Sequence, residues 1–253
     1  DNVPPTADAN GPYAGDRTET VTLDATGSSD PDGTIVHYLW TVDGAQVYSG
    51  TEPTYSLSLS DYDPGTYDVT LTVTDDDGAT DQDTTTLTID NVPPTADANG
   101  PYAGDRTETV TLDATGSSDP DGSIVHYHWS VDGTQVYSGT GATYNLPLSG
   151  YDPGTYDVAL TVTDDDGATD QDTTTLTVDN VPPTADANGP YAGDGTETVT
   201  LDGTGSTDPD GTIGHYLWTV DGTQVYSGTS PTYNLALSGY DPGTYDVALT
   251  VTD

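Results

Sequence analysis

The stretch Gly65–Asp75 reads Gly-Thr-Tyr-Asp-Val-Thr-Leu-Thr-Val-Thr-Asp, and its apolar residues fall on every second position. Alternation with a period of two is the pattern of a strand with one buried face. Other segments of the same unit alternate in this way, and none has apolar residues at helical spacing. The inward positions that we predict in them are Val21 and Leu23; Val36, Tyr38, Trp40 and Val42; Tyr55, Leu57 and Leu59; and Leu87 and Ile89. Ala7–Ala9 and Gln46–Tyr48 are expected to add short strands, which gives about seven per unit.

The chain repeats itself at a constant step. Asp-Asn-Val-Pro-Pro-Thr begins at Asp1, Asp90 and Asp179, which are 89 residues apart, and a fixed period of this kind marks one structural unit per repeat. The predicted domains are residues 1–89, 90–178 and 179–253. The third repeat lacks the equivalent of Asp76–Ile89, so we expect a piece of a longer protein whose last repeat misses its final strand. Its open edge could exchange a strand with another chain, or the sequence simply stops there.

The charge of the chain excludes several classes of partner. It contains 43 acidic and only two basic residues, for a formal net charge of -41. Nucleic acid and anionic membrane surfaces are excluded because both require clustered Lys and Arg. Abundant Val, Thr and Tyr argue against disorder. Repulsion among these charges destabilises the folded chain in dilute buffer, whereas at about 1 M salt the repulsion is screened, which indicates a salt-rich habitat. The preference for Asp and the absence of Lys resemble the proteomes of halophilic archaea. The alternative is that the acidic residues serve only to solvate the surface of an ordinary surface protein.

Two aromatic positions favour a particular β architecture. Trp40 lies on the third expected strand, where immunoglobulin-like sandwiches bury a tryptophan, and Tyr67 follows Asp63-Pro64-Gly65-Thr66, where a tyrosine corner would lie. The fold class that we predict is all-β, with tandem immunoglobulin-like β-sandwiches. The three tryptophans are expected in the cores, not on a sugar-stacking surface. The chain has no cysteine, so neither disulfides nor thiolate metal sites can hold the domains together.

Four motifs in each repeat resemble the PKD (polycystic kidney disease) domain. In the first repeat they are Pro5–Tyr13 (Pro-Thr-Ala-Asp-Ala-Asn-Gly-Pro-Tyr), Gly27–Ile35 (Gly-Ser-Ser-Asp-Pro-Asp-Gly-Thr-Ile), Tyr38–Trp40 (Tyr-Leu-Trp) and Gly65–Asp75. The resemblance covers each repeat from end to end. One departure is the shortened Trp-Thr-Val-Asp-Gly at Trp40–Gly44, where the family often has Trp-Asp-Phe-Gly-Asp-Gly, and it leaves the loop geometry there open.

Oxygen-bearing side chains alternate in the loop before Gly33. Ser28, Asp30 and Asp32 can converge if the loop curls, and oxygen ligands alone indicate a hard cation. The resemblance implies a calcium site that also includes an Asn before Gly-Pro and the Asp that ends the sixth strand. The implied ligands are Asn10, Ser28, Asp30, Asp32 and Asp75; Asn99, Ser117, Asp119, Asp121 and Asp164; and Asn188, Ser206, Asp208, Asp210 and Asp253. The alternative is that Asp-Pro-Asp-Gly is only a turn. Affinity is expected at about 0.1 to 1 mM, as in extracellular modules.

No nucleophile motif or phosphate loop occurs, and no catalytic residue is predicted. The resemblance implies an extracellular or cell-surface array of calcium-stiffened spacers, a building block of surface layers, adhesins or filaments. The alternative that it implies is an accessory module of a secreted hydrolase that binds substrate or polysaccharide. The expected partners are other copies of the repeat, by strand exchange among other means, other surface proteins, or extracellular polysaccharide; no nucleic acid and no membrane insertion are expected.

Overall fold

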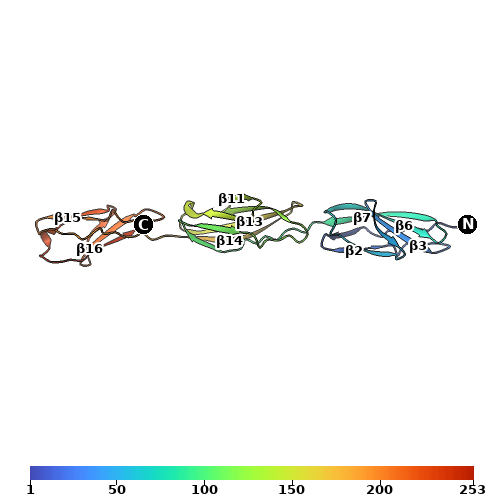
Figure 1. Ribbon diagram of the computed structural model, residues 1–253, viewed down its shortest axis with the longest axis horizontal. Coiled ribbons are helices and arrows are strands. Elements are labelled where there is room, and N and C mark those ends of the chain that lie inside the picture. The colour runs from blue at the N-terminus through green and yellow to red at the C-terminus, as the bar shows by residue number, and fades with distance from the viewer.

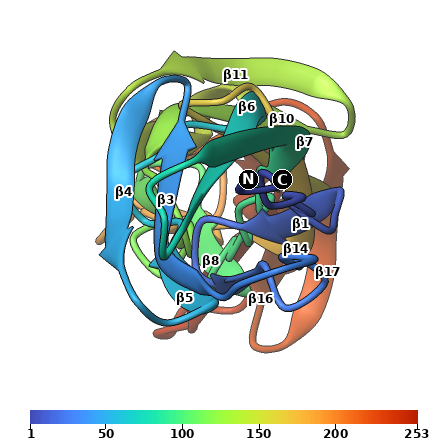
Figure 2. The same cartoon turned by 90° about the vertical axis from the view of Figure 1, so that its right-hand side faces the viewer.

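The computed structural model describes residues 1–253 and consists of three β-sandwiches placed end to end (Figure 1). The N-terminus lies at one end of the long axis, whereas the C-terminus lies on the side of the third repeat that is nearer to the second (Figure 1), where Asp253 accepts a bond from Asn180. In the view along that axis both termini lie near the middle of the outline (Figure 2). The only helical elements are two three-residue 3-10 turns, neither of which could traverse a lipid bilayer. The all-β, immunoglobulin-like sandwich fold predicted above is confirmed.

The first repeat contains seven strands, which are β1 (Tyr13–Asp16), β2 (Thr20–Asp24), β3 (Ile35–Val42), β4 (Ala45–Gly50), β5 (Thr54–Ser58), β6 (Gly65–Asp75) and β7 (Thr80–Asp90). One sheet has the order β1-β7-β6-β3-β4, and the other is the pair β2-β5. All pairs are antiparallel except β1 with β7, which run parallel in the register Tyr13 to Leu87 through Asp16 to Asp90.

The second repeat has the same topology, and the third lacks part of it. The second contains β8 (Tyr102–Asp105), β9 (Thr109–Asp113), β10 (Ile124–Val131), β11 (Thr134–Gly139), β12 (Thr143–Pro147), β13 (Gly154–Asp164) and β14 (Thr169–Asp179). The third contains β15 (Thr198–Asp202), β16 (His215–Val220), β17 (Thr223–Gly228), β18 (Thr232–Ala236) and β19 (Val247–Thr252). It has no counterpart of β7, and the residues equivalent to β1 form no strand beside that position.

The core of each complete sandwich is closed around one tryptophan. Trp40 is 0% exposed and packs in a cluster of 13 buried residues, as does Trp129 in the second repeat. Trp218 is equally buried, but its cluster contains only four buried residues because the last strand is missing. The prediction that these indoles are core residues is confirmed. An open groove of about 480 Å³ runs along the third repeat between Tyr191–Gly195 and Asp241–Val247.

Two predictions about the strands were wrong. Val36 is 44% exposed, because a β-bulge between Ile35 and His37 shifts the register against β6 and turns Ile35 inward instead. The segment Ala7–Ala9 forms no strand; the amide N–H groups of Ala7 and Ala9 donate to the carboxylates of Asp81 and Asp83 on β7, at 2.9 and 2.8 Å. A side-chain ladder thus replaces the expected backbone ladder at this edge.

Two turns match the sequence. The hydroxyl group of Tyr67 donates to the backbone oxygen of Asp63 at 2.7 Å, which is the tyrosine corner, and Tyr156 does the same to Asp152. After the third strand, Asp43 and Gly44 both have positive φ, 46° and 76°, as the central residues of a type I′ hairpin turn do. The shortened loop is therefore a tight hairpin.

Candidate cation site at the ends of the repeats

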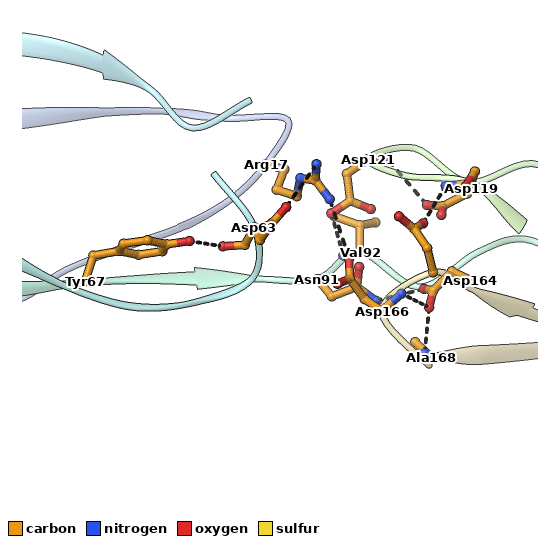
Figure 3. Close-up of polar contacts among 12 residues, drawn as sticks. Arg17, Asp63, Tyr67, Asn91, Val92, Asp119, Asp121, Asp164, Asp166 and Ala168 are labelled. Carbon is orange, nitrogen blue, oxygen red and sulfur yellow. Dashed lines mark hydrogen bonds and ion pairs between the residues drawn. The ribbon is translucent and has the colours of Figure 1, made fainter. Parts of the chain in front are cut away.

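One end of each sandwich carries an acidic corner, formed in the first repeat by Asp30 and Asp32 and by Asp75 at the end of β6. The backbone N–H of Thr34 donates to Asp76 Oδ1 at 2.8 Å, and the N–H of Asp76 donates to the oxygen of Thr34 at 3.1 Å. These two bonds hold the loop after β2 against the β6–β7 hairpin. Figure 3 shows the same corner in the second repeat, where Asp119, Asp121 and Asp164 surround one space.

Several carboxylate oxygens at these corners are buried without a hydrogen-bond partner. They are Asp30 Oδ2, Asp119 Oδ2, Asp121 Oδ1, Asp208 Oδ2 and Asp210 Oδ1. A buried anionic oxygen without a donor is unfavourable, and the pattern occurs in all three repeats. Hard oxygen donors of this kind match the preference of Ca²⁺. The donor set therefore fits a divalent cation.

The electrostatics of the corner differ from residue to residue. Burial raises the pKa of Asp119, and the neighbouring carboxylates of Asp121 and Asp164 raise it further. The Asn2 side-chain amide holds the pKa of Asp75 below its ordinary value, and backbone N–H groups, including that of Ala79, act in the same direction. The Asp75 carboxylate therefore also serves as the cap of its hairpin, whereas the carboxylate of Asp119 has an excess of negative neighbours.

The residues that sequence analysis missed are in the linker. Asn2 Nδ2 donates to Asp75 Oδ2 at 2.8 Å, and the N–H of Val3 lies 3.2 Å from each Asp32 carboxylate oxygen. The equivalent bonds in the later repeats join Asn91 to Asp164, Val92 to Asp121, Asn180 to Asp253 and Val181 to Asp210, at 2.6 to 3.1 Å. The only sequence signal for this role was the return of Asp-Asn-Val-Pro-Pro at each junction.

Two members of each ligand set implied by the resemblance lie elsewhere. Ser28 Oγ accepts a bond from the N–H of Asp8 at 3.0 Å, and the amide of Asn10 interacts with the carboxylate of Asp24. The same placement holds for Ser117, Asn99, Ser206 and Asn188. The structure therefore leaves the carboxylates at the acidic corner, where Asp119 is close enough to Asp121 and Asp164 for their charges to raise its pKa, and places the Ser and Asn beside a different turn.

The carboxylates as placed are not yet in a ligand geometry. No group of three or more His, Asp or Glu side chains is arranged to hold a metal ion. An ion at the corner would therefore require the carboxylate side chains to rearrange. The buried carboxylate oxygens without a hydrogen-bond partner are the stronger guide to the chemistry of the corner.

Comparison with known proteins identifies the repeats. The PKD domain family matches residues 2–89, 91–178 and 180–253. The pre-pro-metalloprotease PrtV of Vibrio cholerae is 39% identical over 153 residues, which are 60% of this chain and 15% of that protein. The dyslexia-associated protein KIAA0319 of Homo sapiens is 34% identical over 249 residues, 91% of this chain and 23% of that protein. The crystal structure of the PKD1 domain of PrtV is 35% identical, covers 35% of this chain and 100% of its own, and has a TM-score of 0.27. The chain thus spans less than a quarter of these two relatives.

Proposed function

All three repeats belong to the PKD domain family, and we propose that the chain is a non-catalytic, extracellular spacer whose junctions are stiffened by calcium. The observation that carries this proposal is the attachment of each linker to the domain that follows it. β7 ends at Asp90, and the next residue, Asn91, already bonds to Asp164 of the second repeat. Val92 bonds to Asp121 of the same corner at 3.1 Å. No free segment therefore separates the two sandwiches.

The prolines of the linker support the same conclusion. Val92 precedes Pro93 and Pro94, and consecutive prolines favour an extended, semi-rigid backbone. The extended arrangement in Figure 1 is what such junctions produce. A rod of this kind separates whatever is attached to its two ends.

Calcium would act at the corner to which the linker is bonded. Asp119, Asp121 and Asp164 would hold the ion in the second repeat, and the residues at equivalent positions would do so in the others. The ion would supply positive charge to oxygens that have no donor. Because Asn91 and Val92 bond to the same carboxylates, ordering of these side chains would also order the linker.

An accessory binding module of a secreted hydrolase is the second candidate. Relatives named as a metalloprotease and as a collagenase, 39% identical over 153 and over 90 residues, favour it. The buried indoles oppose a tryptophan platform for sugars, since Trp40, Trp129 and Trp218 are all 0% exposed. Near-identical copies in series favour the spacer.

Small-angle X-ray scattering at constant high salt, with calcium and with a chelator, tests the proposal. We expect the longest maximum dimension with calcium and a shorter, broader distribution in chelator. The test variant combines Asp30→Asn, Asp119→Asn and Asp208→Asn. The control with the same net charge combines Asp68→Asn, Asp157→Asn and Asp246→Asn at exposed positions. The test variant should behave in calcium as the unmodified chain does in chelator. Identical scattering of the unmodified chain in both buffers would refute calcium stiffening.

A further inference from the structure

The only two basic residues of the chain occupy one position of the repeat. Arg17 and Arg106 lie in the turns that join β1 to β2 and β8 to β9, and Gly195 is at the equivalent place in the third repeat. This turn is at the end of the sandwich that faces the next repeat (Figure 3). In a chain with a net charge of -41, two cations at one repeated end of the domain are an unusual arrangement.

Arg17 contacts acidic groups of two different repeats. Its Nη2 lies 3.9 Å from Asp63 Oδ1 in its own repeat, and its Nη1 lies 3.5 Å from Asp166 Oδ2 in the second repeat. The Arg17 side chain is 19% exposed and that of Asp166 is 27% exposed, so the inter-repeat pair is less screened by solvent than a surface pair. Asp166 belongs to the hairpin that follows Asp164, next to the acidic corner described above.

Nothing apolar shares this contact. The cleft around it is lined by Arg17–Thr20, Ser58 and Ser60 from the first repeat and by Pro120–Gly122 from the second, with no hydrophobic side chain. At this cleft, therefore, polar and charged groups face each other across the junction. The Arg17–Asp166 pair joins the two repeats directly, beside the bonds that attach the linker to the second repeat.

We propose that Arg17 is an interdomain clasp, which fixes the first repeat on the second by bridging Asp63 and Asp166. The surface that it presents fits the acidic hairpin of a following repeat. Gly195 cannot form this contact, so the third repeat presents an end that lacks the clasp. Neither Asp63 nor Asp166 is among the carboxylates assigned to the ion, but the N–H of Asp166 donates to Asp164 Oδ1 at 3.1 Å, so calcium is held constant in the test below.

Arg106 is a matched control within the same chain. It repeats the contact inside its own domain, with Nη2 3.6 Å from Asp152 Oδ1, and the position equivalent to Asp166 falls after Asp253, outside the sequence. Arg106→Ala therefore removes the same side chain and the same local pair without touching the first junction.

Double electron–electron resonance between spin labels measures the two junctions separately. The chain has no cysteine, so labels can be placed at exposed Ser56→Cys and Asn145→Cys for the first junction, and at Asn145→Cys and Asn234→Cys for the second. In the unmodified background we expect a narrow distance distribution at the first junction. Arg17→Ala or Asp166→Asn should broaden the distribution at the first junction and leave that at the second unchanged, and Arg106→Ala should leave the first narrow.

The exchanged pair Arg17→Asp with Asp166→Arg should restore the narrow distribution, which a merely local effect of either substitution would not do. All measurements use one calcium concentration and one salt concentration, and circular dichroism checks that each variant keeps its β-structure. An unchanged width in Arg17→Ala, or equal broadening by Arg17→Ala and Arg106→Ala, would overturn the proposal.

Discussion

Replacement of Asp119 by Asn should change the stability of the second repeat in opposite directions with and without calcium. Asp119 Oδ2 is buried without a partner, and its pKa is raised by burial and by the nearby carboxylates. A carboxyl group whose folded pKa exceeds its unfolded value destabilises the fold in its ionised form. In chelator at neutral pH, Asp119→Asn should therefore stabilise the repeat, by up to about 1–3 kcal/mol, the cost of an unsatisfied buried group.

With calcium the sign reverses. At a free calcium concentration of about 10 to 100 times Kd, one bound ion stabilises a repeat by about 1.4 to 2.7 kcal/mol. We expect Asp119→Asn to lose most of this stabilisation. The pH dependence follows the same linkage. As the pH falls toward the raised pKa, folded Asp119 takes up its proton before the unfolded chain does, so the destabilisation in chelator fades in the unmodified chain. The variant should lack this part of the pH dependence.

Amide hydrogen exchange followed by mass spectrometry resolves the second repeat in peptides that contain Pro147 and extend into β13, because β13 alone has the same sequence as Gly243–Asp253. Calcium should slow exchange along β13 of the unmodified chain about 10- to 100-fold, since each 1.4 kcal/mol is tenfold. The matched control is Asp157→Asn, an exposed position of the same strand with the same change in charge. If Asp119→Asn slowed or accelerated exchange equally in both buffers, the assignment of an ion to this corner would be refuted.

Three further outcomes are expected. Asn2→Ala should raise the pKa of Asp75 toward its ordinary value in a carbon-13 NMR titration, because the Asn2 amide is the largest cause of its depression. The ionised Asp75 carboxylate stabilises the first repeat above its ordinary pKa, and this stabilisation is lost as the pH falls; the variant should lose less stability over that pH range than the unmodified chain. Trp129→Ala should destabilise its repeat by about 3–5 kcal/mol in the exchange experiment, and Trp129→Phe by much less, since the indole N–H has no partner. A peptide with the sequence of β14, Thr169–Asp179, should bind the groove of the third repeat in isothermal titration calorimetry. The same peptide with Leu176→Asp should not bind, because Leu176 is 0% exposed in the second repeat. Equal heats from the two peptides would contradict a strand-shaped groove.

Alternation in the sequence predicted the strands well where one face of a strand is buried over its whole length. Gly65–Asp75 is β6 with the expected bounds, and Val69, Leu71 and Val73 are all 0% exposed. The pattern failed at Val36 because a bulge changes which residue faces inward without any change in composition.

The strand Tyr13–Asp16 was missed for a related reason. Its four residues include two small ones and pair only with β7, far along the sequence, so no local periodicity identifies it. The segment Ala7–Ala9 looked more strand-like but is held by aspartate side chains of β7 instead.

The acidic corner was only partly visible in the sequence. Asp30 and Asp32 are two residues apart and meet by local geometry, whereas Asp75 was placed there by resemblance. The contributions of Asn2 and Arg17 arise from contacts at the ends of the repeats, and spacing within one repeat carries no information about them. The salt-rich habitat inferred from composition stays a prediction.

The parallel pairing of β1 with β7 determines how a pulled repeat would resist. The chain enters each complete sandwich ahead of one strand of this pair and leaves through the other, and the four residue pairs run in register from Tyr13–Leu87 to Asp16–Asp90. Tension along the rod therefore shears the two strands along their length. Their hydrogen bonds are loaded at the same time and do not break one after another. The repeat geometry thus suits an element that transmits force.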